Sequence, residues 1–573
     1  MADRTGRAGT LGWLSVHLRP QGWLLLLFTV ATVAAHLLAT LIPLYVGRAF
    51  DELTRQDPAL TVVVNAALVI AALGVGRFLA DLLSAGSMEI VAQRVKRDAR
   101  DQLFRSLLDK GQAFHDRQRI GDILARTIND ARLVDYLISP GVATAFNGVI
   151  ALVIPIIFIA TMRAELLLAP ALLVTVFAFA LWRHVRRLHP LTRRLRRRFT
   201  DLNEQFSETL TGMATVQASG QERNELAKFD TAATAYRDAY VRRGYAQAVY
   251  LPALGFGLGM AAGSVHSLAL FSAGELALAQ VITYLGWLGL FAVPISMSEQ
   301  SVPVIQEGYV ACARMHELTD ADSDQREPTG GTTAMVTGSV TFDRVSFTYQ
   351  GRVILRDVSF HLPAGRTLAV VGPTGSGKTM LTKLVNRTYD VTGGRVLIDG
   401  RDISDWQPGA LRRQIGNVHQ DAFLFSKSVF DNVAFGVHRP VSSEEVSEVA
   451  QLARADGFIR QLPQGYDTVL NEGGNTLSGG QRQRMVISRA LIADPPILTL
   501  DDATSAIDAR TAQEITDAID ALTTGRTTIL VSHRPDQIRR ADLILVLDRG
   551  AVAGLGSHAE LIDHCALYRE IYR

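Results

Sequence analysis

The sequence predicts an α-helical domain with six transmembrane helices, followed by an α/β domain that carries a phosphate-binding loop and a helical subdomain. Three observations lead to this fold class. The first roughly 320 residues contain six apolar stretches, each long enough to span a bilayer. The second part contains a short apolar strand, a glycine-rich loop and the start of a helix, in the order typical of parallel α/β sheets. Between the spans, apolar residues recur at helical spacing, so the long connections are predicted to be helical as well.

The apolar stretches match a hydrocarbon core about 30 Å thick, which about 20 helical residues cross. The hydrophobic fraction of the whole chain is 48%, a value that averages this half with the more polar second half. The predicted spans are Trp23–Val46, Leu60–Leu83, Leu137–Ala160, Leu166–Val185, Ala246–Phe271 and Leu276–Met297.

Basic residues gather before the first span, between the second and third, and after the fourth. The other connections are short and poor in cations, so the positive-inside rule places the basic connections in the cytoplasm. Both termini and the second domain are then cytoplasmic, in a multi-pass protein of the cell (inner) membrane. The longest basic run, Arg183–Arg198, directly follows a span. We expect it to set topology and contact anionic membrane lipid, and we expect no nucleic acid partner.

The domain boundaries follow from these patterns. Residues 1–319 form the predicted transmembrane domain, in which Val91, Val95, Ala99, Leu103 and Leu107 run down one face of a helix that continues beyond the second span. Residues 320–337 are rich in Asp, Gly and Thr, lack apolar periodicity and are the predicted linker. Residues 338–573 form the second domain. The two cysteines, Cys312 and Cys565, give no basis for a disulfide or a metal site.

In the second domain, residues 372–379 match the motif G-x-x-x-x-G-K-[ST], which predicts a nucleotide site. The strand Leu368–Val371 precedes the motif, and apolar residues at helical spacing follow it. In this context backbone N–H groups point at phosphate oxygens, Lys378 pairs with the β- and γ-phosphates, and the Thr379 hydroxyl holds Mg²⁺. The predicted ATP-binding residues of the loop are Gly372, Pro373, Thr374, Gly375, Ser376, Gly377, Lys378 and Thr379.

Further site residues follow later strands of the same domain. Asp501 and Asp502 end the strand that begins at Pro496, and we expect Asp501 to act on the Mg²⁺ side and Asp502 to face the attacking water. His533 follows another strand and can contact the γ-phosphate. Gln420 can bring an amide oxygen to the metal, which makes Thr379, Gln420 and Asp501 the predicted Mg²⁺ ligands. Tyr349 lies upstream, where an aromatic ring can stack on adenine.

A second motif, about a hundred residues after the loop, supplies the family resemblance. It consists of Leu477, Ser478, Gly479, Gly480 and Gln481. Together with the glycine-rich loop, Gln420, Asp501, Asp508 and His533, this motif makes the region from about Val340 to Arg573 resemble an ABC transporter nucleotide-binding domain. The resemblance implies a head-to-tail dimer in which each loop, called Walker A, faces the partner's signature motif. Ser478 and the amides of Gly479 and Gly480 then contact the partner's γ-phosphate. Asp508 corresponds to the family's D-loop aspartate.

The membrane half is similar to ABC exporters of the type IV architecture. The segments Phe114–Asp116 and Gly212–Gln217 resemble the coupling regions of that family, which connect the membrane helices to the nucleotide-binding domains. The resemblance therefore implies a half-transporter that moves an unidentified substrate across the membrane at the expense of ATP.

One residue departs from the family pattern in the predicted active site. Asp502 stands where the family usually carries glutamate. Its carboxylate would sit about 1 Å or more from the water-activating position, and such a misplacement can cost about 10²-fold in rate. Subunits with one weakened ATP site are typical of heterodimeric bacterial exporters, so a second ABC half-transporter is the favoured partner. A homodimer that turns over slowly is the alternative, and the retained His533 is compatible with it.

Three other interpretations remain open at this point. Some proteins with the exporter fold are importers, for example of siderophores; some ABC ATPases are soluble proteins of DNA repair or translation; and a few exporter-like proteins are ATP-gated channels or regulators. The six predicted spans argue against the soluble class. Nothing in the sequence fixes the direction of transport or the cargo.

Overall fold

The computed structural model describes residues 2–118, 120–249, 251–321, 330–437, 439–502 and 525–572, together with 516, 519 and 523. The chain divides into two compact units. The first contains Met1–Leu108 with Arg119–Ala321, and the second contains Asp109–Gln118 with Asp322–Arg573. The predicted D-loop residue Asp508 lies outside the described residues.

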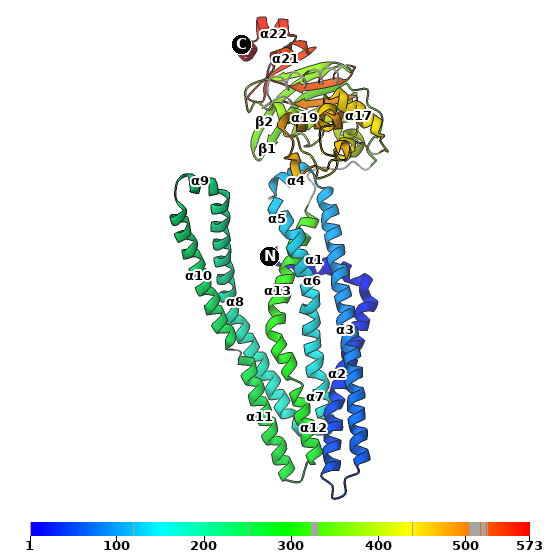
Figure 1. The fold of residues 1–573 in the computed structure, drawn as a ribbon, viewed down its shortest axis with the longest axis vertical. Coiled ribbons are helices and arrows are strands. Elements are labelled where there is room, and N and C mark those ends of the chain that lie inside the picture. The colour runs from blue at the N-terminus through cyan, green and yellow to red at the C-terminus, as the bar shows by residue number, and fades with distance from the viewer. Residues whose placement is uncertain are drawn as a thin grey trace. The chain divides into compact units, whose positions relative to one another are not determined.

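The described part of the first unit is helical, and Figure 1 shows its long helices. Short helical segments at 19–21, 126–130, 137–142 and 164–167 connect or extend the longer elements. These are α1 (Ala2–Leu18), α2 (Gly22–Leu53), α3 (Leu60–Leu108), α5 (Ile120–Ala125), α6 (Ala131–Tyr136), α7 (Ala143–Met162), α8 (Leu168–Thr211), α9 (Met213–Ala218), α10 (Glu222–Ala248), α11 (Leu251–Ser272), α12 (Leu278–Gly289) and α13 (Ala292–Asp320).

Among the described residues of this unit, six helical stretches are long and apolar enough to cross a membrane, and they confirm the six predicted spans. Each predicted span lies within or overlaps one of them. The stretches are Gly9–Leu53, Leu60–Leu108, Ile120–Met162, Ala164–Thr211, Glu222–Ser272 and Leu278–Ser298. Figure 1 shows that α8 and α10 run side by side beyond the spans and are joined at their far ends by the short α9.

The helical extensions pack as the apolar periodicity predicts. Along α3, Val91, Val95, Ala99 and Leu103 are fully buried, because residues three to four positions apart share one face of a helix. Ion pairs also connect the helical extensions to one another. Lys96 Nζ lies 2.8 Å from Asp135 Oδ2 on α6, and Arg314 Nε on α13 donates to Asp130 Oδ2 at 2.8 Å.

The described residues of the second unit form two sheets. The antiparallel sheet has the order β2-β1-β4-β5, and the larger sheet has the order β10-β9-β3-β8-β7-β6, in which all strands from β9 to β6 are parallel. The strands are β1 (Val340–Tyr349), β2 (Arg352–Leu362), β3 (Thr367–Val371), β4 (Gly393–Ile398), β5 (Arg401–Asp402), β6 (Ile415–Val418), β7 (Ile497–Asp501), β8 (Thr527–Val531), β9 (Leu543–Asp548) and β10 (Ala551–Gly556).

Burial of the strands explains their sequences. Every residue of β7 and β8 is buried, as expected for central strands of a parallel sheet that is covered on both faces. The core of the helical subdomain continues into the larger sheet, where Val446, Leu477 and Met485 belong to the same cluster as Leu498 and Leu500 of β7. The helices of this unit are α4 (Gln112–Arg117), α14 (Lys378–Val385), α15 (Pro408–Arg412), α16 (Val429–Ala434), α17 (Ser443–Leu452), α18 (Asp456–Ile459), α19 (Gly479–Leu491), α21 (Pro535–Arg540), α22 (His558–His564) and α23 (Ala566–Tyr572).

Candidate nucleotide-binding site

The glycine-rich loop connects the buried strand β3 to the N-terminus of α14. Gly372, Gly375 and Gly377 adopt φ values of +154°, +80° and +101°, a conformation that favours glycine. At Gly372 a Cβ atom would lie 2.2 Å from the backbone oxygen of Leu547, so the closeness of the two backbone segments also excludes a side chain. The loop therefore has the strand, turn and helix start that a phosphate-binding loop requires.

Lys378 lies at the base of this loop. The residue is 8% exposed, and its Nζ donates to the backbone oxygens of Gly372 at 2.7 Å and Pro373 at 3.0 Å. Burial lowers the pKa of the ammonium group, because desolvation disfavours its charged form. An anion within reach of Lys378 would relieve that penalty, which fits its predicted role beside the β- and γ-phosphates.

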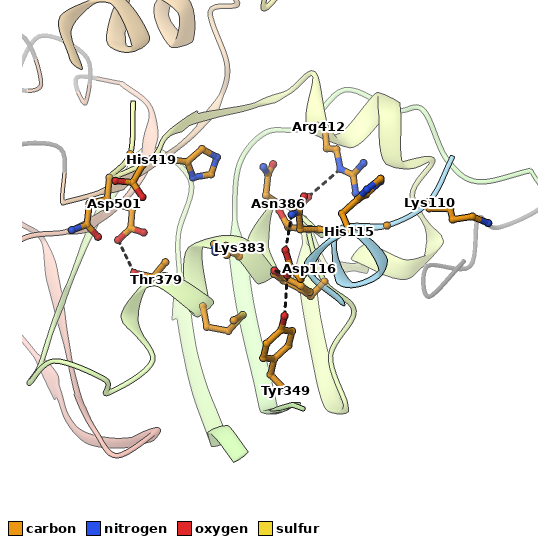
Figure 2. A pocket seen from close by; sticks show the side chains of 17 residues that line it. Lys110, His115, Asp116, Tyr349, Thr379, Lys383, Asn386, Arg412, His419 and Asp501 are labelled. Carbon is orange, nitrogen blue, oxygen red and sulfur yellow. Dashed lines mark hydrogen bonds between the residues drawn. The ribbon is translucent and has the colours of Figure 1, made fainter. Parts of the chain in front are cut away.

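Thr379 and Asp501 bring oxygen ligands together at the end of β7. The Thr379 hydroxyl donates to Asp501 Oδ1 at 3.1 Å, as Figure 2 shows. Asp501 is almost fully buried, and this burial raises the pKa of its carboxyl group. A hydroxyl and a carboxylate in a desolvated position suit Mg²⁺, which prefers oxygen ligands and would stabilise the charged form of Asp501.

The predicted catalytic residues meet the loop in one cavity of about 420 Å³. Gln420, Asp502 and His533 follow β6, β7 and β8, so the carboxyl ends of three neighbouring parallel strands deliver them to the same edge of the sheet. Ligands of open α/β sheets bind at this edge. The cavity is lined by Thr374, Gly375, Ser376, Gly377, Lys378, Thr379, Gln420, Asp501, Asp502 and His533, among others.

Tyr349 lines a second, adjoining cavity of about 770 Å³ that shares Thr379, Gln420 and Asp501 with the first. Figure 2 shows that its hydroxyl points to Asp116 of α4, and the donor–acceptor distance to Oδ2 is 3.1 Å. Tyr389 donates to the same oxygen, and Gln112 donates to Oδ1 at 2.8 Å. Although burial alone would raise the pKa of Asp116, these hydrogen bonds from Tyr389, Gln112 and Tyr349 hold it below its usual value.

Sequence reasoning did not connect Asp116 or Tyr389 with Tyr349. Asp116 was identified only as part of a coupling region, and 233 residues separate it from Tyr349. The structure assigns α4 to the second unit, so the helix that follows α3 in the chain packs with the strand that bears the predicted adenine-stacking ring. A carboxylate that accepts from two phenols can fix the orientation of that ring.

Asp116→Asn is therefore expected to raise the KM for ATP about three- to tenfold while changing kcat little, because charge-assisted hydrogen bonds are about twice as strong as neutral ones. The measurement is ATPase activity against ATP concentration. Gln112→Ala is the matched control, since it removes the bond to Oδ1 and leaves both tyrosine contacts in place. An equal rise in KM in both variants would show that Asp116 supports α4 and not the orientation of Tyr349.

The signature motif lies apart from both cavities. Ser478 caps α19, accepting from the Gln481 N–H at 3.3 Å while the Gln481 side chain accepts from the Ser478 N–H at 2.8 Å. Leu477 is buried in the subdomain core, whereas Ser478 and Gly479 are exposed. In the part of the chain that the structure describes, none of the five signature residues lines either cavity.

Comparisons with known proteins agree for both halves of the chain. The family model of the ABC transporter transmembrane region matches residues 25–295, and the ABC transporter model matches residues 355–505. The chain is 33% identical over 505 residues to the uncharacterised ABC transporter ATP-binding protein YknV of Bacillus subtilis, covering 87% of this chain and 83% of that protein. It is 32% identical over 507 residues to the ATP-dependent lipid A-core flippase of Pseudomonas aeruginosa, covering 88% and 83%.

A solved structure is similar over nearly the whole chain. The structure of a bacterial Atm1-family ABC exporter with ATP bound superimposes with a TM-score of 0.84 at 31% identity, covering 97% of this chain and 98% of that one. The order of domains, the six apolar helices and the ATP-binding fold are therefore shared. The chain belongs to the ABC transporter family, as a multi-pass membrane protein of half-transporter architecture with the type IV exporter fold, in which ATP hydrolysis is coupled to transport.

Proposed function

We propose that the chain is one subunit of a dimeric exporter whose two nucleotide-binding domains close head to tail over two ATP molecules. The observation that carries this proposal is the position of Ser478, which caps an exposed helix N-terminus and lines neither nucleotide cavity of its own chain. A helix N-terminus attracts phosphate, so this surface suits an ATP held by another copy of the domain. Closure would rearrange the membrane helices through α4 and α9.

Magnesium is part of this proposal. Thr379, Gln420 and Asp501 would hold the ion, because their hydroxyl, amide and carboxylate oxygens line the same cavity. When bound, Mg²⁺ neutralises charge on the β- and γ-phosphates. Lys378 would pair with the β- and γ-phosphates, and His533 would contact the γ-phosphate.

We further propose that the partner is a second, different half-transporter. Asp502 lines the cavity beside Lys378 and His533, but its side chain is one methylene shorter than the glutamate usual in the family. This chain's ATP would then act as a persistent clamp, while the partner's site hydrolyses most of the ATP. The alternative is a homodimer in which Asp502 and His533 support slow turnover.

Transport out of the cytoplasm is favoured over import. The relatives include a protein named as a lipid A-core flippase, and the similar solved structure is that of an exporter. The predicted orientation, with both termini and the ATP-binding domain on the cytoplasmic side of the cell membrane, rests on the arginines between the spans. ATP-driven accumulation of cargo in inside-out vesicles, and not in right-side-out vesicles, is the outcome that separates export from import.

The composition of the dimer is tested by producing two differently tagged copies of this chain in the native cell. We expect that the two tags do not copurify from detergent extracts and that a second half-transporter does. ATPase activity should require both chains. Copurification of the two tags in comparable amounts, with full ATPase activity and no second chain, would establish the homodimer instead.

A further inference from the structure

The first unit contains a cavity of about 300 Å³ between α8, α10 and α13, and arginine is the most frequent residue in its lining. Four arginines line it (Arg193, Arg196, Arg243 and Arg314), together with His184 and His189 and one acidic residue, Glu307. This cavity lies in the membrane domain, so it is not part of the nucleotide site described above.

The basic run of α8 has two distinct faces. His189, Arg193 and Arg196 are spaced by four and three residues, which places them on one side of the helix, and all three line the cavity. Arg187 and Arg194 are exposed and do not line it. Arg193 and Arg196 are exposed as well, so the two sets differ in whether they line the cavity and not in their exposure. The positive-inside rule accounts for the charge of the whole run, but it does not require that part of the run lines a cavity.

Two of the four arginines already have acidic partners. Arg196 pairs with Glu307, and Arg314 pairs with Asp130. Arg193 and Arg243 have no acidic partner among the described residues, and the buried Nε of Arg243 lacks any hydrogen-bond acceptor there. Arg193 is exposed and Arg243 is half-buried, so the cost of an unsatisfied polar group falls on Arg243 Nε. With four arginines and one glutamate, the lining has an excess of positive charge that an anion would satisfy.

Most of the remaining lining is apolar, and Thr192, Gln247 and Gln306 are its neutral polar residues. Leu133, Val185, Leu188, Val302 and Val310 contribute aliphatic side chains next to the guanidinium groups. A site of this kind suits a molecule with an anionic group and an adjoining apolar body, since the arginine fork binds phosphate or carboxylate oxygens in pairs.

We infer that this cavity binds the anionic group of the transported substrate, an amphiphile that carries a phosphate or carboxylate, through Arg193 and Arg243. The inference rests on the proposed export function, for which it names the substrate class. A phosphate group can come from a lipid headgroup or from a water-soluble organic phosphate, and the two sources are separated by experiment.

The test measures binding to the full-length protein, purified with its partner in neutral detergent. The probes are oleoyl lysophosphatidate, oleoyl lysophosphatidylcholine and glycerol 3-phosphate. The first two share their acyl chain but differ in net charge, and the third lacks the chain. The double variant Arg193→Gln/Arg243→Gln is compared with Arg187→Gln/Arg194→Gln, which removes the same charge from exposed positions outside the cavity.

We expect lysophosphatidate to bind the cavity variant at least roughly tenfold more weakly than the unaltered protein, and the control variant within about twofold. Lysophosphatidylcholine should bind weakly to all three proteins. If the cavity variant weakens glycerol 3-phosphate binding as much as it weakens lysophosphatidate binding, the source of the phosphate is a water-soluble molecule. If glycerol 3-phosphate binding is unchanged, the source is a lipid. Both results support the anion site.

Equal weakening in the cavity and control variants would overturn the inference, as would equally tight binding of the choline lipid. Thermal unfolding midpoints and the charge-conserving variant Arg193→Lys/Arg243→Lys guard against a simple folding defect, because the lysines should retain part of the anion affinity. Basal ATPase is measured on the unaltered protein and the control variant. If that activity is absent, the proposed function fails, whereas activity without arginine-dependent binding refutes only the anion site.

Discussion

Replacing Asp502 with glutamate is expected to raise ATP hydrolysis at this chain's own site by up to about 10²-fold. The structure explains why aspartate cannot compensate for its shorter reach. Its backbone N–H donates to the Val531 oxygen at 3.0 Å, which attaches the end of β7 to β8 and prevents the carboxylate from advancing through a backbone shift. The added methylene would instead carry the carboxylate forward into the cavity that Lys378 and His533 line.

The measurement must isolate this site. In a heterodimer, the partner's catalytic carboxylate is replaced by its amide, so that the remaining ATP turnover reports the site with Asp502. In a homodimer, total ATPase activity reports it directly. Asp502→Asn keeps the size of the side chain but removes its charge, and should lower the remaining turnover further. If Asp502→Glu is no faster than the unaltered protein, the length of this side chain does not limit hydrolysis.

The backbone of Asp502 adds a stability measurement to the same experiment. Its φ of +44° lies in the left-handed region, which aspartate tolerates better than longer side chains. The glutamate variant is therefore expected to unfold at a slightly lower temperature while it hydrolyses ATP faster. This opposite change in stability and rate separates a catalytic gain from a general stabilisation of the domain.

Local patterns were sufficient to predict much of this fold. The face formed by Val91, Val95, Ala99 and Leu103 is buried because a helical repeat reports directly which residues turn inward. The strand predicted at Leu368–Val371 lies within β3 for a similar reason, since a short, fully apolar run is what a strand buried on both faces requires. In both cases the physical cause acts over a few neighbouring residues.

Contacts between distant segments were beyond such patterns. The order β10-β9-β3-β8-β7-β6 depends on crossovers that no local repeat records, and the bond between Tyr349 and Asp116 joins segments 233 residues apart. The periodicity of α8 likewise separates its faces but does not reveal what covers them. The sequence therefore favoured a role in topology for the whole arginine run, whereas the structure places Arg193 and Arg196 in a cavity with Arg243 of α10.

Replacing Ser478 with alanine is expected to slow hydrolysis of the ATP held by the partner's Walker A loop by about 10²-fold, the usual effect of removing one donor from a site of developing negative charge. Ser478 also caps α19 through reciprocal bonds with Gln481, so the same substitution removes a structural contact. Loss of such a cap costs about 1 kcal/mol of stability. ATPase activity alone cannot distinguish these two effects.

Ser557 supplies the matched control. It caps α22 through the same reciprocal arrangement with Glu560, in the same unit but outside the signature motif. Ser478→Ala and Ser557→Ala should therefore lower the unfolding temperature by similar amounts, and only Ser478→Ala should reduce ATPase activity. Equal activity in the two variants would remove the basis for assigning Ser478 to a nucleotide site.

The location of the lost activity tests the head-to-tail arrangement itself. Vanadate traps nucleotide only at a site that has completed hydrolysis, and a photoreactive ATP analogue then labels the chain whose Walker A loop holds it. In a heterodimer, Ser478→Ala should abolish labelling of the partner and leave binding of ATP by this chain unchanged. Such a result requires the side chain of one subunit to act on the nucleotide of the other, because Ser478 lines neither cavity of its own chain. Loss of labelling from this chain instead would mean that its domains close in some other geometry.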